Sequence, residues 1–478
     1  MERVAREDLV MFMNAAIAST GQREFRSGAA EQRMSLEFLH EYVMGNYRDL
    51  YASTLALEIN HLNAVMIVTN LLRTASEAGP EQREREGRLI AARLGTLPPQ
   101  RVYAMIRRLR RLKVNNRRTR AIIRDWVKAR PDPAFDAVKY RRGLSVAARH
   151  AHLALPDEVG TALFDWRRPK RYETPILESW RRAHYEQRAL YDLPYTAAEG
   201  LAARHGITRA RFLKQIAPNL TGGERLRLQE TAERNHQTGA LSMDLGRVPL
   251  TRLAIYVLSL PRDERARRRD ELTGALRDAA ERAAGRWAGA WDPMVAVLDD
   301  SYSAYGSGVK RRRPLAVALA VHFMLEALSR NYTGLWLHHR GDPLLVHPIG
   351  ATGLGERLVD ALELRPAHVV VVSDGWDNAP PGLAAEVLRV WHRRLRRSSD
   401  TSVVHFNPVY EADTFDVRHL SPHVPSIGIR DAESAPELFW LAEYAAGEAD
   451  GELNHYLNER VQKFLRTGKE KWWTPSPI

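Results

Sequence analysis

The stretch Asp292-Pro-Met-Val-Ala-Val-Leu-Asp-Asp-Ser-Tyr-Ser303 predicts a buried strand that ends in oxygen-bearing side chains. Its apolar run, residues 294–298, contains two valines, which is typical of a strand covered on both faces. Asp299, Ser301 and Ser303 then follow in an Asp-x-Ser-x-Ser pattern. A carboxylate and two hydroxyls in one turn suit a hard divalent cation such as Mg²⁺, because such ions prefer oxygen ligands. The same pattern also suits a strand end capped by Ser and Asp, so other segments are needed to distinguish these two interpretations.

Two later segments favour the metal site. Thr352 lies in the glycine-rich turn Ile349-Gly-Ala-Thr-Gly-Leu-Gly355, and a second apolar strand, His368-Val-Val-Val-Val-Ser-Asp-Gly375, runs into Asp374. In an open α/β sheet the ends of parallel strands meet at one edge, where ligands bind. Five oxygen donors are therefore expected to converge. Two further acids, Asp300 and Asp377, are expected to be solvated loop residues.

The ordered set Asp299/Ser301/Ser303, Thr352 and Asp374 resembles the metal-ion-dependent adhesion site of von Willebrand factor A domains. The resemblance covers about residues 288–478. It implies a Mg²⁺ or another divalent cation, held by these residues directly or through water. It also implies that an acidic group of a partner can complete the coordination.

The remainder of this half alternates strands and helices, which predicts a mainly parallel, doubly wound α/β sheet. Besides 294–298 and the strand that ends at Asp374, strands are expected near 333–338, 343–347, 402–406 and 426–429. Helices are expected at 313–330, 355–364 and 382–397, from residue 436 onward, and in a last stretch that reaches 465.

Length and composition indicate a two-domain protein without disulfides. The chain has 478 residues, 44% of them hydrophobic, and no cysteine, which agrees with a reducing cytoplasm. The amino terminus lacks the apolar core of a signal peptide. The longest apolar stretch, residues 314–328, is interrupted by His322 and Glu326 and is too short to span a membrane. We therefore expect a cytoplasmic protein with no membrane partner, and expect this stretch to be a buried helix.

The positive charge is concentrated in one segment. Residues 101–150 contain 16 Lys and Arg against three acids, an excess equal to the net charge of +13 of the whole chain. Charge runs are often solvated helix faces, but such faces normally mix signs. A dense single-sign segment indicates a polyanionic partner, most often a nucleic acid.

Residues 1–286 predict helix after helix, with apolar residues at three-and-four spacing, as in Val102, Met105, Ile106 and Leu109. The helices can stack as a solenoid or form a single bundle. Trp126 is expected in the core. Phosphate contacts would position an RNA without reading its sequence. The residues predicted to bind RNA are Arg107, Arg108, Arg111, Lys113, Arg117, Arg118, Arg120, Lys139, Arg141, Arg142, Arg149 and His152.

Residues 120–156 resemble the central segment of the TROVE module of Ro autoantigen proteins, and the domain order extends the likeness over nearly the whole chain. The resemblance implies an RNA-binding domain of HEAT-like helical repeats at 1–286, possibly closed into a ring, and a von Willebrand A-like domain at 287–478. Ro proteins bind small structured noncoding Y RNAs and single-stranded 3′ ends of misfolded RNAs. Bacterial relatives work with exoribonucleases in RNA quality control. The family's Asn-Gly-Trp-Ser-His stretch is shortened here to Gly143-Leu-Ser-Val146, which puts binding of a standard Y RNA in doubt.

Three functional classes follow. The first is a non-catalytic RNA-binding scaffold, whose partners are small noncoding RNA, single-stranded RNA ends, and an exoribonuclease or another protein. The second is a protein-interaction adaptor that grips acidic groups through a Mg²⁺-bound A domain. The third, a metal-dependent hydrolase, is favoured least, because no His-rich ligand set, paired acid and base, or phosphate-cradling lysine loop accompanies the five donors.

Overall fold

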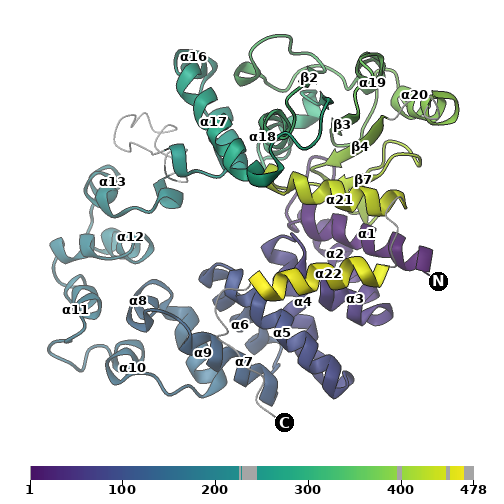
Figure 1. Ribbon diagram of the computed structural model, residues 1–478. Helices are drawn as coiled ribbons and strands as arrows, with labels where there is room; N and C mark the ends of the chain where they lie inside the picture. The colour runs from purple at the N-terminus through teal and green to yellow at the C-terminus, as the bar shows by residue number, and fades with distance from the viewer. Residues whose placement is uncertain (1, 226–227, 229–244, 396–400, 448–452, 468–478) are drawn as a thin grey trace. The chain divides into compact units, whose positions relative to one another are not determined.

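The computed structural model describes residues 2–225, 228, 245–395, 401–447 and 453–467 (Figure 1). The chain forms two compact units. The first, which we call the sheet unit, consists of Met1–Thr54, Glu58–Asn63 and Asp244–Leu457. The second, the helical unit, consists of Leu55–Leu57, Ala64–Met243 and Asn458–Ile478. These contacts group the residues differently from the predicted boundary at 286/287, since the first helices of the chain belong with the sheet. The functional division between an RNA-binding half and a metal-binding half remains a proposal.

The sheet unit is built on five parallel strands in the order β2-β1-β3-β4-β7. The predicted parallel, doubly wound sheet is therefore confirmed. The predicted strand at 343–347 is wrong: Pro343–Leu345 is a 3-10 turn, because Pro343 cannot donate to a ladder and the Asp342 side chain accepts the Leu344 N–H at 3.0 Å. The strands are β1 Met294–Leu298, β2 Tyr332–Trp336, β3 His368–Val372, β4 Ser402–Asn407 and β7 Ser426–Gly428.

Helices cover both faces of the sheet, because alternate residues of each strand point to opposite sides. On one face, Val295 and Val369 pack with Leu358 and Leu388 in a buried cluster. On the other face, the Phe406 ring lies 5.3 Å from the Phe439 ring. The helices of this unit are α1 Glu2–Ala18, α2 Ala29–Asn46, α3 Arg48–Ser53, α15 Leu250–Ser259, α16 Arg262–Arg267, α17 Arg269–Ala284, α18 Arg313–Leu328, α19 Leu354–Glu363, α20 Leu383–Val390 and α21 Ala435–Ala446.

The helix predicted from the longest apolar stretch is α18, and it is buried along most of its length as expected. His322 is half-buried and its Nδ1 lies 2.9 Å from the Tyr332 hydroxyl. In the described part of the chain, no helix is both long enough and apolar enough to cross a membrane.

Helix α1 covers the edge strand β7. Asn14, fully buried, donates its amide to the Ser426 carbonyl at 3.0 Å and to Asp416 Oδ1 at 2.8 Å. Its Oδ1 accepts the Gly428 N–H at 2.8 Å. A β-carbon on Gly428 would lie 2.7 Å from the Asn14 carbonyl oxygen, so the helix and the strand are in close backbone contact. One amide thus satisfies the polar groups of an otherwise open sheet edge.

Asn14→Ala is expected to destabilise the sheet unit by about 3 kcal/mol, because it leaves the Ser426 carbonyl and the Gly428 N–H buried without partners. Thermal unfolding followed by circular dichroism measures the effect. The control is Asn46→Ala, which removes an exposed hydrogen bond of 2.8 Å to the Tyr42 carbonyl and is expected to be nearly neutral. Equal stability of the two variants would show that α1 is not fixed by Asn14.

The helical unit is a succession of helices that pack on their neighbours. The predicted inward residues Val102, Met105, Ile106 and Leu109 are all buried. Trp126 is also buried, as expected, and its indole N–H donates to the Leu94 carbonyl at 3.3 Å. The helices are α4 His61–Arg73, α5 Pro80–Thr96, α6 Pro99–Arg111, α7 Arg117–Lys128, α8 Pro133–Lys139, α9 Arg141–Ala151, α10 Asp157–Phe164, α11 Pro175–Arg182, α12 Tyr195–Arg204, α13 Arg209–Ile216 and the part of α22 Leu453–Thr467 from Asn458 on.

Helices α6 and α9 touch at Gly143. A β-carbon there would lie 2.5 Å from the Tyr103 Cβ, so only glycine allows this approach. Tyr103 cannot move freely, since its hydroxyl donates to Asp136 Oδ2 at 2.8 Å and Asp136 also accepts from Arg130 Nε at 2.7 Å. The close contact fixes where α9 lies on α6.

Gly143→Ala is expected to destabilise the helical unit by about 2 kcal/mol, because the added methyl group forces the two helices apart. Gly160→Ala is the matched control: Gly160 is also helical, but a β-carbon there meets nothing within 4 Å. Alanine favours a helix over glycine, so the control is expected to be neutral or slightly stabilising. Thermal melts of both variants test the contact, and equal melting temperatures would contradict it.

Candidate metal site and candidate RNA-binding surface

Two buried carboxylates follow neighbouring strands. Leu298 pairs with Val372 at the carboxyl ends of β1 and β3; Asp299 comes directly after Leu298, and Asp374 comes two residues after Val372. Their side chains are shielded, with residue exposures of 4% and 6%. Burial, and then the charge of Asp374, raises the pKa of Asp299 to about 7. Burial also raises the pKa of Asp374. Two acids in this position favour a cation between them.

Three hydroxyls converge on the same carboxylates. The Ser301 Oγ lies 3.1 Å from the Ser303 Oγ, and the Thr352 Oγ1 donates to the Ser301 Oγ at 3.1 Å. Ser303 also hydrogen-bonds the Asp374 carboxylate. The structure therefore brings together all five residues predicted as metal ligands, from three separate loops.

The donor set fits a divalent cation of the Mg²⁺ type. All five groups offer oxygen, two of them charged, and the buried like charges are the electrostatic imbalance that a cation would relieve. A bound Mg²⁺ would supply positive charge for an acidic group that approaches from outside. Asp299 and Asp374 would neutralise the ion, while the hydroxyls would orient it.

Asp300 and Asp377 were expected to be solvated loop residues, and for Asp300 this expectation is wrong. This carboxylate is fully buried and accepts the backbone N–H groups of His338 and His339, each at 2.9 Å. Asp377 is half-buried and accepts N–H groups at the starts of two helices, Leu354 at 3.2 Å and Ala384 at 2.7 Å. Both acids hold the loops that carry the metal-site residues. Their roles depend on contacts across the fold, which the local sequence does not reveal.

Sequence reasoning missed the residues around the mouth of the site. Trp376 follows Asp374 by two positions and donates its backbone N–H to the Asp374 carboxylate at 3.1 Å. The guanidinium groups of Arg26 and Arg418 lie 3.8 and 3.7 Å from the Trp376 ring centroid. Trp376 was visible as an aromatic residue beside a predicted ligand. Nothing in the sequence linked Arg26 to it.

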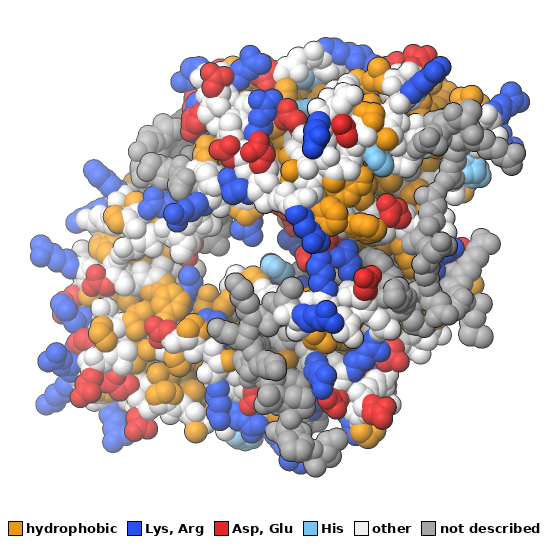
Figure 2. All heavy atoms as spheres, viewed as in Figure 1, with side chains coloured by type: hydrophobic (Ala, Val, Ile, Leu, Met, Phe, Trp, Pro, Cys, Tyr) orange, Lys and Arg blue, Asp and Glu red, His pale blue; other side chains and the backbone are white. Residues whose placement is uncertain are grey.

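On the helical unit, the structure separates the predicted RNA-binding cations into two groups. Figure 2 shows Lys and Arg side chains mixed with Asp and Glu over the visible face, so exposure alone does not single out a surface. Pairing does. Among the described residues, no acidic partner is found for eight of the twelve predicted residues: Arg107, Arg108, Arg111, Lys113, Arg117, Arg142, Arg149 and His152.

The other four have internal hydrogen-bond or ion-pair partners. Arg118 pairs with buried Glu86 at 3.2 Å, and Lys139 pairs with Glu224 at 3.4 Å. Arg120 donates to the Asn115 carbonyl at 3.0 Å. Arg141 donates to the carbonyls of Ala162 and Leu163 at the end of α10, and burial lowers its pKa. Arg118, Lys139 and Arg141 connect segments that are distant in the chain, while Arg120 makes only a local contact.

Two turns carry the exposed cations to neighbouring positions. The His150 Nε2 lies 2.9 Å from the Val114 carbonyl oxygen, which joins the end of α9 to the turn between α6 and α7 (Figure 1). Exposed cations flank both sides of this link. We call Arg111, Lys113, Arg117, Arg149 and His152 the basic turn surface. Arg149 lies over the Phe164 ring, with its guanidinium carbon 5.0 Å from the centroid.

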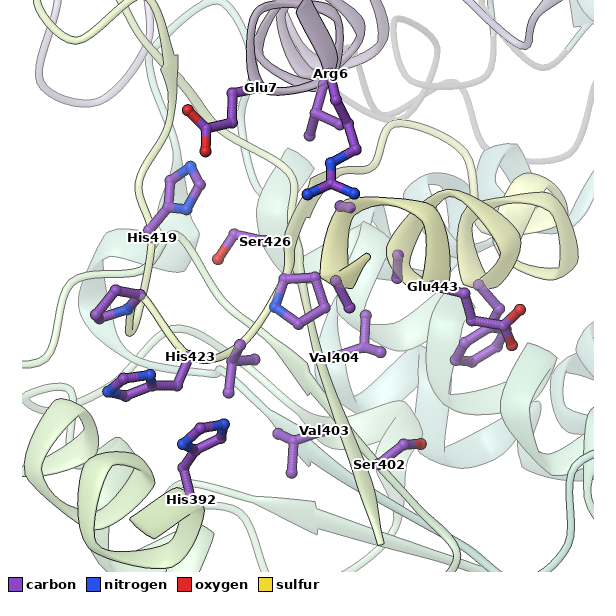
Figure 3. Close-up of a pocket in the computed structure, with 18 of the residues that line it drawn as sticks. Arg6, Glu7, His392, Ser402, Val403, Val404, His419, His423, Ser426 and Glu443 are labelled. Carbon is purple, nitrogen blue, oxygen red and sulfur yellow. The ribbon is translucent and has the colours of Figure 1, made fainter. Parts of the chain in front are cut away.

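A separate cavity of about 670 Å³ lies in the sheet unit (Figure 3). Arg6 and Glu7 of α1, Val403 of β4 and Ser426 of β7 line it. The His392 and His423 rings stack there, with centroids 4.4 Å apart. Within the described ranges, no group of three or more His, Asp or Glu side chains is arranged to hold a metal ion. The cavity was not predicted from sequence.

Comparison with solved structures shows which known fold this arrangement of helices and a parallel α/β sheet resembles. Among solved structures, the crystal structure of the Ro (RSR) protein of Deinococcus radiodurans is similar to this chain, with a TM-score of 0.53 and 15% sequence identity. The likeness covers 92% of this chain and 100% of that one. The predicted likeness to Ro proteins and the predicted fold class are thus confirmed at the level of the fold.

Sequence comparison adds no closer relationship. No protein-family model matches the chain, and no curated protein matches it.

Proposed function

We propose that this protein is a non-catalytic RNA-binding scaffold. The observation that carries the proposal is the basic turn surface, where four exposed cations and the exposed His152 from two adjoining turns have no acidic partner among the described residues. Unpaired Lys and Arg at this density bind phosphates and release counterions. The fold likeness to a Ro protein supports the same function. The RNAs we propose are small structured noncoding RNAs and single-stranded ends of misfolded RNAs. The setting is RNA quality control in the cytoplasm, with an exoribonuclease as protein partner.

The test is RNA binding as a function of salt. A structured RNA with a single-stranded 3′ tail is titrated with the full chain between about 50 and 200 mM salt. Four or five phosphate contacts predict a slope of log affinity against log salt of roughly −3 to −4. Sequencing the nucleic acid that co-purifies at low salt identifies the RNA. Absence of binding at 50 mM salt would refute the proposal.

A second candidate function is a protein-interaction adaptor that grips acidic groups through Mg²⁺. The convergence of Asp299, Asp374 and three hydroxyls favours it. It predicts a partner that is lost on chelation by EDTA and lost in Asp299→Ala, while RNA binding is unaffected. The two functions use different surfaces, so one protein can have both.

A further inference from the structure

The mouth of the candidate metal site is built around one tryptophan. Arg26 and Arg418 each place a guanidinium within 3.8 Å of the Trp376 ring centroid. Two cations cannot share one face of a ring at this distance, so they cover opposite faces. Stacking of this kind orients a guanidinium and leaves its edge free for hydrogen bonds. Both cations are close enough to lower the pKa of Asp374, against the larger effect of burial. We call Arg26, Trp376 and Arg418 the stacked rim.

Arg26 comes from outside the α/β sequence, in the segment between α1 and α2. Neighbouring residues anchor this segment beside the metal site. The Arg23 carbonyl accepts the Ser307 hydroxyl at 2.7 Å, and buried Glu24 pairs with Lys310. The Phe25 ring lies 6.3 Å from the ring of Tyr302, which stands between two predicted metal ligands in the chain. These contacts of the three preceding residues place Arg26 beside the metal site.

The two arginines differ in what they already bind. Arg418 lies 3.6 Å from Glu411, which also accepts the Trp376 indole N–H at 2.6 Å. Arg26 is exposed, and no acidic partner for it is found in the part of the chain that the structure describes. An incoming anion can therefore approach the exposed guanidinium of Arg26, which its stacking on Trp376 holds next to the metal site.

The space at the site selects the kind of anion. The cavity that Asp299, Ser303 and Asp374 line has a volume of about 10 Å³, comparable to a single water-sized guest such as the metal ion itself. A carboxylate on a slender side chain can present one oxygen to an ion held there. A phosphodiester would bring two sugars against the rim. Both faces of Trp376 are already covered, so the ring cannot stack a base. The exposed Phe25 and Tyr302 rings offer apolar contacts to a peptide.

We propose that the stacked rim is a specificity site for an acidic protein segment with two neighbouring carboxylates. One carboxylate reaches the Mg²⁺ site, and the second forms a bidentate pair with Arg26. The inference rests on the adaptor function, deepens it by naming the partner's chemistry, and is independent of the basic turn surface.

The test uses fluorescent Gly/Ser peptides with the full chain in Mg²⁺. One peptide carries Asp-Gly-Glu, a second carries Asp-Gly-Gln, and a uridine oligonucleotide of equal charge is the third probe. The wild-type protein is expected to bind the two-acid peptide at least tenfold more tightly than the one-acid peptide, and binding is expected to disappear in EDTA. Arg26→Ala is expected to bind both peptides equally, at the one-acid affinity. Such a double-mutant cycle assigns the second acid to Arg26.

Arg286→Ala is the matched control, since Arg286 is also exposed and stacks on a tryptophan, 4.6 Å from the Trp287 centroid. It is expected to retain the tenfold discrimination. Arg26→Lys keeps the charge but not the planar fork, and is expected to lose most of the discrimination. Mg²⁺-induced thermal stabilisation confirms that each variant keeps the metal site.

Three outcomes overturn the inference: equal affinities of the wild-type protein for the two peptides, Mg²⁺-dependent binding of the one-acid peptide without binding of the two-acid peptide, or tighter Mg²⁺-dependent binding of the oligonucleotide through Arg26. Failure of the adaptor function is recognised separately, because it would abolish Mg²⁺-dependent binding of both peptides. RNA binding by the basic turn surface has no bearing on either result.

Discussion

Asp299→Asn is expected to have opposite effects on stability with and without Mg²⁺. In EDTA the variant should be more stable than the wild-type protein, because it removes one of two buried like charges. Burial and Asp374 raise the pKa of Asp299 to about 7, and each pKa unit corresponds to about 1.4 kcal/mol, so a gain of at least ~1 kcal/mol is expected. When the Mg²⁺ concentration is about 100 times the dissociation constant, the free energy of unfolding of the wild-type protein should rise by about 2.7 kcal/mol. That of the variant should change little.

Thermal unfolding in EDTA and in Mg²⁺ measures this crossover. The wild-type melting temperature is expected to rise by about 5 °C with Mg²⁺, and that of the variant to change by less than about 1 °C. Asp413→Asn is the control, because Asp413 is exposed, and it should behave as the wild-type protein does. If Mg²⁺ stabilises Asp299→Asn as much as the wild type, the five oxygen donors do not form the metal site.

Reversing the charge of the basic turn surface is expected to have the largest effect on RNA binding. The triple variant Arg111→Glu, Lys113→Glu, Arg149→Glu should lose at least ~100-fold in affinity at 100 mM salt, because each lost phosphate contact is replaced by repulsion. The magnitude of its salt slope should fall by roughly 2 to 3 units. Fluorescence anisotropy at several salt concentrations gives both quantities.

The control carries the same charge change elsewhere. Arg282, Arg393 and Arg394 are exposed residues of the sheet unit, and their replacement by Glu should leave the slope within half a unit of the wild-type value. Arg141→Ala should lower stability without changing the slope, since its guanidinium already holds the end of α10. A slope that falls equally in the control would show that net charge, and not this surface, binds RNA.

The five residues predicted as metal ligands lie together because the information that places them is local. The runs at residues 294–298 and 368–372, apolar except for His368, are long enough to be strands and too short to be helices of typical length. The side chains that follow each run necessarily lie at the end of that strand. Once two parallel strands are neighbours, Asp299 and Asp374 must lie at the same edge of the sheet. The positions of the inward-facing residues of α6 followed in the same way from helical periodicity.

The sequence did not show which side chains have a partner far away in the chain. Arg118 and Arg117 are adjacent and have the same charge, yet only Arg118 meets a buried glutamate, 32 residues earlier in the chain. Asp300 and Asp299 are adjacent acids, yet Asp300 is used to hold the loop after β2. The sequence shows which side chains can ionise, but tertiary packing determines which of them have an internal partner.

The sequence by itself determined the parallel sheet, the order of its elements, the five oxygen donors and the concentration of positive charge in residues 101–150, because each depends on periodicity or composition within short segments. Only the tertiary structure decided that Asn14 of the first helix satisfies the backbone of β7, 414 residues away at Gly428, that Arg26 stands at the mouth of the metal site, and that some cations are internal while others remain exposed. These features require surfaces distant in the chain to pack together. Their geometry depends on the whole fold, and no local pattern carries it.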